Sequence, residues 1–183
     1  MPATATTAYS NTAPSCHRTR RRSSALTCVF DAFDRLALKY CLIHRYEGFP
    51  ENIQSDIDCI IEDGITGDRL FEILLSLEQI GSFRVVHRRD LCFVIAGRED
   101  DGSHFFVRLD FSRDCIVKGI NISPGSLLLE NRRRCEGIYV PAIGVEFAVL
   151  LARAVIKRGL TSERLARLGH LWLERPTECK AAT

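Results

Sequence analysis

One short segment, Asp56-Ile57-Asp58-Cys59-Ile60-Ile61, constrains this chain more than any other. Its apolar residues are β-branched or small, which is typical of a strand buried inside a sheet. Because side chains on a strand alternate between faces, Asp56 and Asp58 must project from one face while Ile57 and Cys59 project from the other. Two neighbouring carboxylates repel each other unless a cation neutralises them. The segment therefore predicts a buried strand whose acidic pair is suited to a divalent metal.

A third acid, Asp110, interrupts another strongly β-like segment, Val107-Arg108-Leu109-Asp110-Phe111. A carboxylate inside such a strand is costly unless it has a partner. The loop that precedes the acidic pair contains Gly48, and a glycine lets the backbone approach a phosphate group closely. Together these features indicate a site for metal-bound phosphate at the mouth of a buried strand.

Hydrophobic periodicity divides most of the chain into helices and strands. In chain order the predicted elements are a helix at 25–39, strands at 40–46 and 56–62, a helix at 69–80, strands at 83–89, 91–97 and 104–112, and helices at 144–157 and 161–174. The stretch 114–139 has an irregular pattern, and its basic run from Arg132 to Arg134 is typical of an exposed loop. This order predicts a mixed β-sheet flanked by helices, an α/β or α+β domain spanning residues 25–175.

The two ends of the chain are predicted to lie outside this domain. Residues 1–24 are rich in Arg, Ser and Thr and contain no acid. That composition favours a disordered tail, although it also resembles an organellar transit peptide. Residues 176–183 are predicted to be a flexible C-terminus.

Composition excludes some classes of partner and location. The formal net charge of +2 is nearly balanced, so no overall affinity for nucleic acid or acidic membranes is indicated. No apolar run approaches the ~18 residues of a membrane-spanning helix. The eight cysteines have no CxxC spacing, and several lie in apolar runs, which favours reduced thiols in the cytoplasm.

The motifs together resemble the nucleotidyltransferase superfamily of the polymerase-β type. There a helix and a strand lead to a Gly motif, an Asp-hydrophobic-Asp pair opens the next strand, and a third carboxylate comes from a later strand. The matching text in this chain is RYEGFPENIQSDIDCII, from Arg45 to Ile61, and then Leu109-Asp110-Phe111. The first string is most similar to small nucleotidyltransferase-like proteins of bacterial polysaccharide and cell-surface biosynthesis.

The resemblance implies metal-dependent transfer of a nucleoside monophosphate from a nucleoside triphosphate to a hydroxyl or phosphate acceptor. Asp56 and Asp58 would bind the nucleotide-linked Mg²⁺ or Mn²⁺. Asp110 would join a second metal and help to deprotonate or orient the attacking hydroxyl. The implied nucleotide-binding residues are Gly48, Ser55, Arg45 and Lys118.

The Gly motif departs from the pattern of the superfamily. Most active members carry Gly-Ser or Gly-Gly and a longer spacer, whereas here Gly48 is followed by Phe49 and only seven residues separate Gly48 from Asp56. An alternative hypothesis therefore stands beside the enzyme. It is a catalytically inactive module of the same fold that binds a nucleotide or a partner protein.

Overall fold

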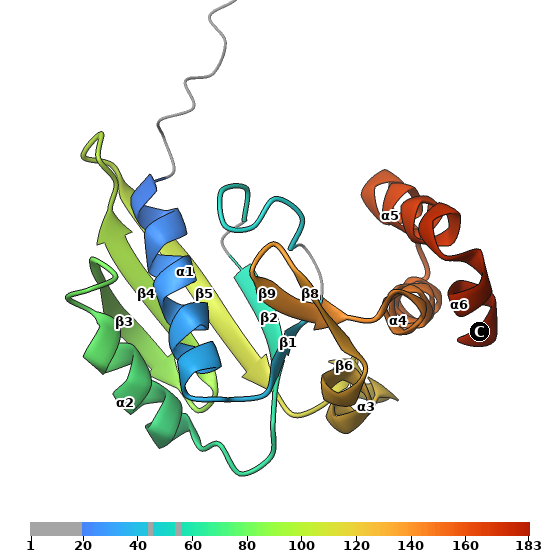
Figure 1. Ribbon diagram of the computed structural model, residues 1–183, viewed down its shortest axis with the longest axis horizontal. Coiled ribbons are helices and arrows are strands. Elements are labelled where there is room, and N and C mark those ends of the chain that lie inside the picture. The colour runs from blue at the N-terminus through green and yellow to red at the C-terminus, as the bar shows by residue number, and fades with distance from the viewer. Residues whose placement is uncertain (1–19, 44–45, 54–55) are drawn as a thin grey trace, which may run out of the picture.

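The computed structural model describes residues 20–43, 46–53 and 56–183, and its centre is a five-stranded sheet. The strands are β1 (Tyr40–Leu42), β2 (Asp56–Ile61), β3 (Phe83–Arg89), β4 (Cys92–Arg98) and β5 (His104–Ser112). They lie in the order β1-β2-β5-β4-β3 (Figure 1). β2 and β5 run parallel and the other neighbouring pairs run antiparallel, so the predicted mixed sheet is confirmed.

Two helices, α1 (Arg20–Arg35) and α2 (Gly67–Leu77), cover one face of this sheet (Figure 1). Their apolar sides pack on the inward residues of all five strands and form the main core. α1 begins earlier than the predicted 25–39, so the predicted tail of residues 1–24 is helical from Arg20 onward. Residues 1–19 lie outside the described residues. Ala37, with φ of 54°, turns the chain from α1 toward β1.

Elements between residues 115 and 157 cover the opposite face of the sheet at β1 and β2. A second apolar cluster there joins Cys41 and Ile60 to side chains of later elements. Those elements are β6 (Cys115–Val117), β7 (Ile120–Ser123), α3 (Gly125–Glu130) and α4 (Ile143–Lys157). The ribbon of β8 (Arg132–Cys135) and β9 (Ile138–Pro141) shows that the basic run predicted as a loop is a strand. Its residues pair with β9, an interaction that local composition does not reveal.

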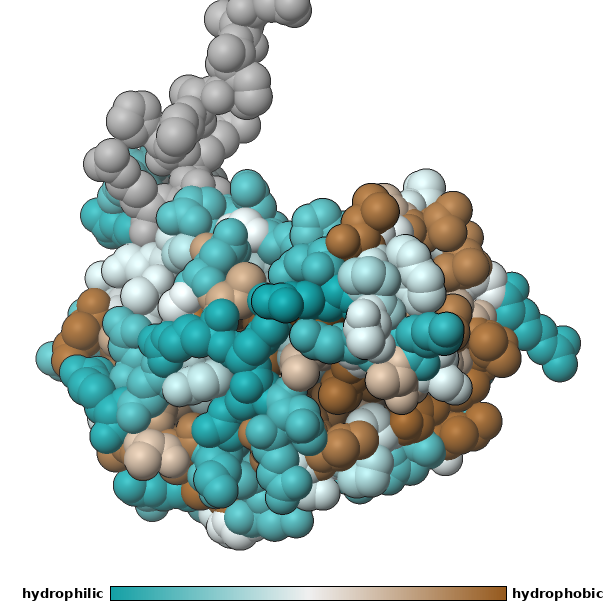
Figure 2. Space-filling view, turned by 45° about the vertical axis from the view of Figure 1, so that its right-hand side comes forward, coloured by the Kyte–Doolittle hydropathy of each residue, from teal (hydrophilic) through white to brown (hydrophobic). Residues whose placement is uncertain are grey.

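Two further helices, α5 (Ser162–Glu174) and α6 (Pro176–Ala181), pack on α4. Residues 176–183 thus differ from the flexible C-terminus that was predicted, because Pro176 starts a helix and Cys179 is fully buried. Figure 2 shows apolar surface gathered on the side of these helices, where Val155, Trp172 and Leu173 are exposed. Among the described residues no helix has the length and apolar composition needed to cross a membrane.

Two phenylalanines test how side chains alternate between the two faces of the sheet. Phe93 of β4 is fully buried and contacts the rings of Phe71 and Phe111, whereas Phe106 of neighbouring β5 is 59% exposed on the other face. We expect Phe93→Ala to lower the free energy of unfolding by about 3–5 kcal/mol through loss of burial and cavity formation. Phe106→Ala should change it by less than about 0.5 kcal/mol. Urea unfolding of both variants measures this, and equal losses would contradict the assigned faces.

Candidate active site

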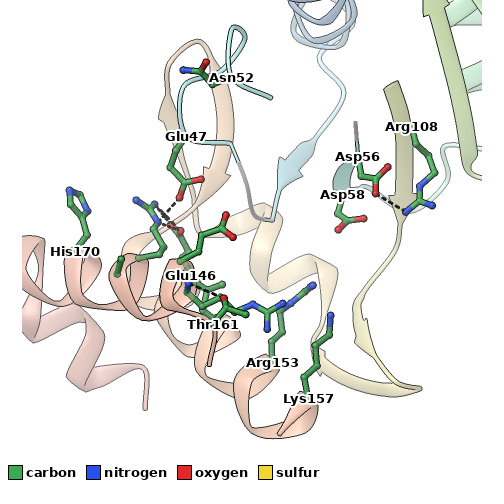
Figure 3. A pocket seen from close by; sticks show the side chains of 15 residues that line it. Glu47, Asn52, Asp56, Asp58, Arg108, Glu146, Arg153, Lys157, Thr161 and His170 are labelled. Carbon is green, nitrogen blue, oxygen red and sulfur yellow. Dashed lines mark hydrogen bonds and ion pairs between the residues drawn. The ribbon is translucent and has the colours of Figure 1, made fainter. Parts of the chain in front are cut away.

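Asp56 and Asp58 lie on the face of β2 that points away from the main core (Figure 3). Ile57 and Cys59, which alternate with them, are only 3% and 1% exposed, whereas both aspartates are half-buried. The acidic pair is therefore held by a strand anchored in the core, while its carboxylates reach solvent.

The parallel pairing of β2 with β5 brings the third acid to the same face. In the register of this pair Asp58 lies beside Asp110, and Asp56 lies beside Arg108. Neighbouring strands are about 4.8 Å apart, and residues in register point to the same side of a sheet. Three carboxylates and one guanidinium therefore share one part of the sheet, which we call the acidic patch.

Arg108 places a positive charge within the acidic patch. Its Nη2 is 3.5 Å from Oδ2 of Asp56, and its Nε is 3.9 Å from Oδ2 of Asp110. The pKa of Asp110 is nevertheless raised above its usual value. Burial is the largest cause, and the charges of Asp58 and Asp56 act in the same direction, whereas Arg108 opposes them. Three carboxylates that face one guanidinium leave an excess of negative charge, which favours a further cation.

The donor set of the acidic patch fits a hard divalent cation, because carboxylate oxygens are ligands that Mg²⁺ and Mn²⁺ prefer. As the side chains lie, however, the described residues contain no group of three acidic, histidine or cysteine side chains placed to hold an ion. The guanidinium of Arg108 lies among these carboxylates and reaches both Asp56 and Asp110.

A pocket of about 680 Å³ lies between the acidic patch and the C-terminal helices. Asp56, Asp58 and Arg108 line one side of it (Figure 3). The other side is formed by α4 and α5 and carries basic side chains that we call the basic wall: Arg153, Lys157, Arg164 and Arg167. The pocket has the size of an ordinary small-molecule site. Glu146 and Glu163 also line the helical side, where the four basic side chains outnumber them, whereas acids outnumber Arg108 on the sheet side.

Like charges are crowded together on the basic wall. Burial lowers the pKa of Lys157 below its usual value, Arg153 and Arg164 lower this pKa further, and Asp58 raises it. Asp58 therefore acts on the same ammonium group from the opposite wall. A ligand with phosphate groups would relieve the repulsion on this wall, just as a metal would relieve the repulsion in the acidic patch.

The loop that contains Gly48 borders the pocket, which Glu47 and Asn52 help to line. Gly48 has φ of +76°, and a Cβ there would lie 2.9 Å from the side-chain nitrogen of Asn52, so both backbone and space require glycine. The buried side chain of Phe49 anchors the loop in the core. The backbone N–H of Gly48 donates a hydrogen bond of 3.1 Å to Oε2 of Glu136.

A buried polar network, which we call the Tyr46 cluster, ties this loop to the C-terminal helices. Glu146 of α4 is 2% exposed and accepts a hydrogen bond of 2.5 Å from the hydroxyl of Tyr46. Arg167 of α5 donates to both carboxylate oxygens of Glu146, at 2.8 and 3.0 Å, and it pairs with Glu47 at 2.9 Å. Arg133 of β8 completes the cluster at 3.7 Å from Glu146. The cluster fixes the Gly48 loop, β8 and α5 around one pocket.

The structure describes two of the four predicted nucleotide-binding residues, Gly48 and Lys118. Gly48 lies in the loop at the pocket, whereas Arg45 and Ser55 lie outside the described residues. Lys118 occupies the turn between β6 and β7, where its Nζ donates to the backbone carbonyl of Ile156 at 3.4 Å. Lys118 is not among the residues that line the pocket, although its charge acts on Lys157, which does line it, so its role in nucleotide binding stays a prediction.

The basic wall was not predicted from the sequence. Arg153 and Lys157 are four residues apart on α4, and Arg164 and Arg167 are three apart on α5, which places each pair on one side of its helix. This spacing is a signal in the sequence, but it is equally typical of an ordinary solvated helix face. Only the packing of α4 on the sheet and of α5 on α4 turns these side chains toward the pocket.

Comparisons with known proteins were made on sequence and on structure. No family model matches this chain, and no curated protein sequence matches it. One similar solved structure is the antibiotic-resistance factor ANT(2'')-Ia, with a TM-score of 0.48, 12% identity and coverage of 89% of each chain. Another is an antigenic nucleotidyltransferase-like protein from Paracoccidioides brasiliensis, with a TM-score of 0.43, 15% identity and coverage of 90% of this chain and 93% of that one. At such values the activity of this chain has to be inferred from its own side chains.

Removing one partner of the Tyr46 cluster should destabilise the fold. In Arg167→Met the buried carboxylate of Glu146 loses its bidentate partner, and breaking a buried ion pair in this way costs about 3 kcal/mol. The matched control is Arg69→Met, which removes an exposed pair with Glu72 on α2 and should cost less than about 1 kcal/mol. Urea unfolding compares the two variants. Similar small losses would show that Arg133 and Tyr46 suffice to hold Glu146.

Asp110 predicts a pH dependence of stability. Its pKa is raised in the folded chain, so folding is disfavoured once the pH exceeds the unfolded pKa of about 3.9 and the carboxyl must ionise. Asp110→Asn removes this penalty. We therefore expect the variant to gain stability over the wild type at pH 7 and to lose that advantage near pH 3. Unfolding midpoints at both values measure the effect, and an advantage that grows on acidification would contradict it.

Proposed function

We propose that this chain is a metal-dependent nucleotidyltransferase. It would bind a nucleoside triphosphate through Mg²⁺ or Mn²⁺ and transfer the nucleoside monophosphate to a hydroxyl or phosphate acceptor. The observation that carries this proposal is the register of β2 with β5, which puts Asp56, Asp58 and Asp110 on one face of the sheet. Asp56 and Asp58 of this group line the pocket opposite the basic wall. Such a bipolar pocket suits a ligand that combines a cation with several phosphates.

The acidic patch supplies the metal ligands in this proposal. Asp56, Asp58 and Asp110 would hold the divalent ion, which when bound neutralises the carboxylates and the phosphates together. Arg153, Lys157 and Arg164 would hold the phosphate chain from the other side of the pocket, where they neutralise charge that develops on the leaving group.

The proposed step is an in-line displacement at the α-phosphorus. The acceptor oxygen forms a bond to that phosphorus, the bond to the bridging oxygen breaks, and pyrophosphate leaves with the electron pair. Asp110 accepts the proton of the acceptor hydroxyl and passes it to solvent.

The sequence before the acidic pair indicates a class of acceptor. The string from Tyr46 to Ile61 resembles small proteins of bacterial polysaccharide and cell-surface biosynthesis, which directs the search to sugar phosphates and alcohols. The pocket has room for a nucleotide, and an acceptor would enter along the exposed part of β5 beside Arg108.

A second function is favoured by one contact. The N–H of Gly48, the group expected to grip a phosphate, already donates to Glu136. A chain that keeps this contact would bind a nucleotide, or a partner protein, without transfer. This alternative predicts metal-dependent binding and no release of pyrophosphate with any acceptor tried.

Calorimetry with each of the four nucleoside triphosphates, with MgCl₂ and with EDTA, tests the proposal. We expect metal-dependent binding by the wild type and at least about tenfold weaker binding by Asp58→Asn, because a charged ligand contact contributes about 1.5–3 kcal/mol. The matched control is Asp68→Asn on α2, outside the pocket, which should bind as the wild type does. Binding that ignores both EDTA and Asp58→Asn would remove the proposal, and pyrophosphate release separates the enzyme from the inactive module.

A further inference from the structure

Arg108 occupies the position in the acidic patch where a cation would bind. It reaches Asp56 and Asp110 at 3.5 and 3.9 Å, and these are two of the three carboxylates proposed as metal ligands. Both distances are long for ion pairs, and the Arg108 side chain is 47% exposed. The guanidinium is therefore held loosely enough to be displaced.

Glu136 is the counterpart of Arg108 at the Gly48 loop, because its charged side chain contacts a group that is expected to bind the ligand. It lies at the turn between β8 and β9, with φ of 48°, and its carboxylate accepts the hydrogen bond from the Gly48 N–H. A carboxylate oxygen and a phosphate oxygen are both anionic acceptors, so they compete for the same backbone donor. Glu136 is exposed and can rotate into solvent when a stronger anion arrives.

In both contacts a charged side chain of the protein lies where a ligand group of the same charge is expected to bind. A cation of the chain lies among the acids, and an anion of the chain lies on the amide of the glycine loop. We propose that Arg108 and Glu136 are internal counter-ions that set the affinity of the pocket, because a metal-bound polyphosphate must displace both to bind. This inference rests on the proposed function, since it concerns the same pocket and the same class of ligand.

Exposed ion pairs are individually weak, and this fixes the size of the expected effects. Loss of either counter-ion should tighten binding of the matching ligand by about three- to tenfold, rather than by orders of magnitude. A merely structural ion pair predicts the opposite sign, because its removal loosens the strands and the loop that carry the site. The sign of the change in affinity therefore separates the two roles.

The cationic half is tested by binding of Mn²⁺ to the full chain, followed by the electron paramagnetic resonance signal of the free ion. We expect Arg108→Gln to bind Mn²⁺ about three- to tenfold more tightly than the wild type. Arg108→Lys keeps the charge but loses the fork that spans two carboxylates, so it should fall between them. The matched control is Arg69→Gln, which is similarly exposed and should bind as the wild type does. Unchanged or weaker binding by folded Arg108→Gln and Arg108→Lys would overturn the inference.

The anionic half is tested by calorimetry with inorganic tripolyphosphate in the presence of Mn²⁺. Glu136→Gln keeps an acceptor of the same shape but removes its charge, and Glu136→Ala removes both. We expect both variants to bind tripolyphosphate about three- to tenfold more tightly, whereas Glu130→Gln on α3 should match the wild type. Equal affinity across the set would overturn the role of Glu136.

Failure of the inference and failure of the proposed function give different results. If the wild type and every variant bind neither Mn²⁺ nor tripolyphosphate at millimolar concentration, the proposed function falls and the inference falls with it. If the wild type binds both ligands and the Arg108 and Glu136 variants bind them no more tightly, only the inference falls. Unfolding midpoints in EDTA show that each variant is folded before either comparison is made.

Discussion

The parallel pairing of β2 with β5 is the interaction on which the rest of this structure depends. Its register sets Asp58 beside Asp110 on one face and Ile57 beside Leu109 in the core. A shift of one residue would turn the carboxylates toward the aromatic core and expose its aliphatic residues, so the apolar face enforces the position of the acids. The same residues that stabilise the sheet therefore also place the candidate site.

The parts of the fold that the sequence could predict are those that local patterns encode. Alternation along residues 56–61 was enough to assign the faces of β2, and β3 and β5 were predicted with the bounds that the structure has. The pairing of β2 with β5 was not predicted, because the two strands are separated by a helix and two strands and nothing local specifies that they meet. The Tyr46 cluster is equally non-local, since Arg167 lies 121 residues after Tyr46.

The basic run from Arg132 to Arg134 shows how a local pattern can be misinterpreted. Three successive arginines suggested an exposed loop, but their side chains alternate as those of a strand do. Arg132 and Arg134 lie over the ring of Tyr139, at 4.6 and 5.2 Å from its centre, while Arg133 points to Glu146. Cation–π contacts and a buried partner offset the repulsion that the sequence alone implied. The strand becomes recognisable only once Tyr139 and Glu146 are placed.

Two charged contacts within the chain, one in the acidic patch and one at the Gly48 loop, constrain what can bind. A free metal ion can displace Arg108 but leaves Glu136 on the glycine loop, and a free polyphosphate does the reverse. A ligand that carries both charges displaces both contacts in one event. Because the metal and the phosphates of such a ligand also coordinate each other, each would raise the affinity for the other by the same factor, since coupling between two ligands is reciprocal. Under the proposed function, such a pocket would favour the metal-bound polyphosphate as a unit over either ion alone.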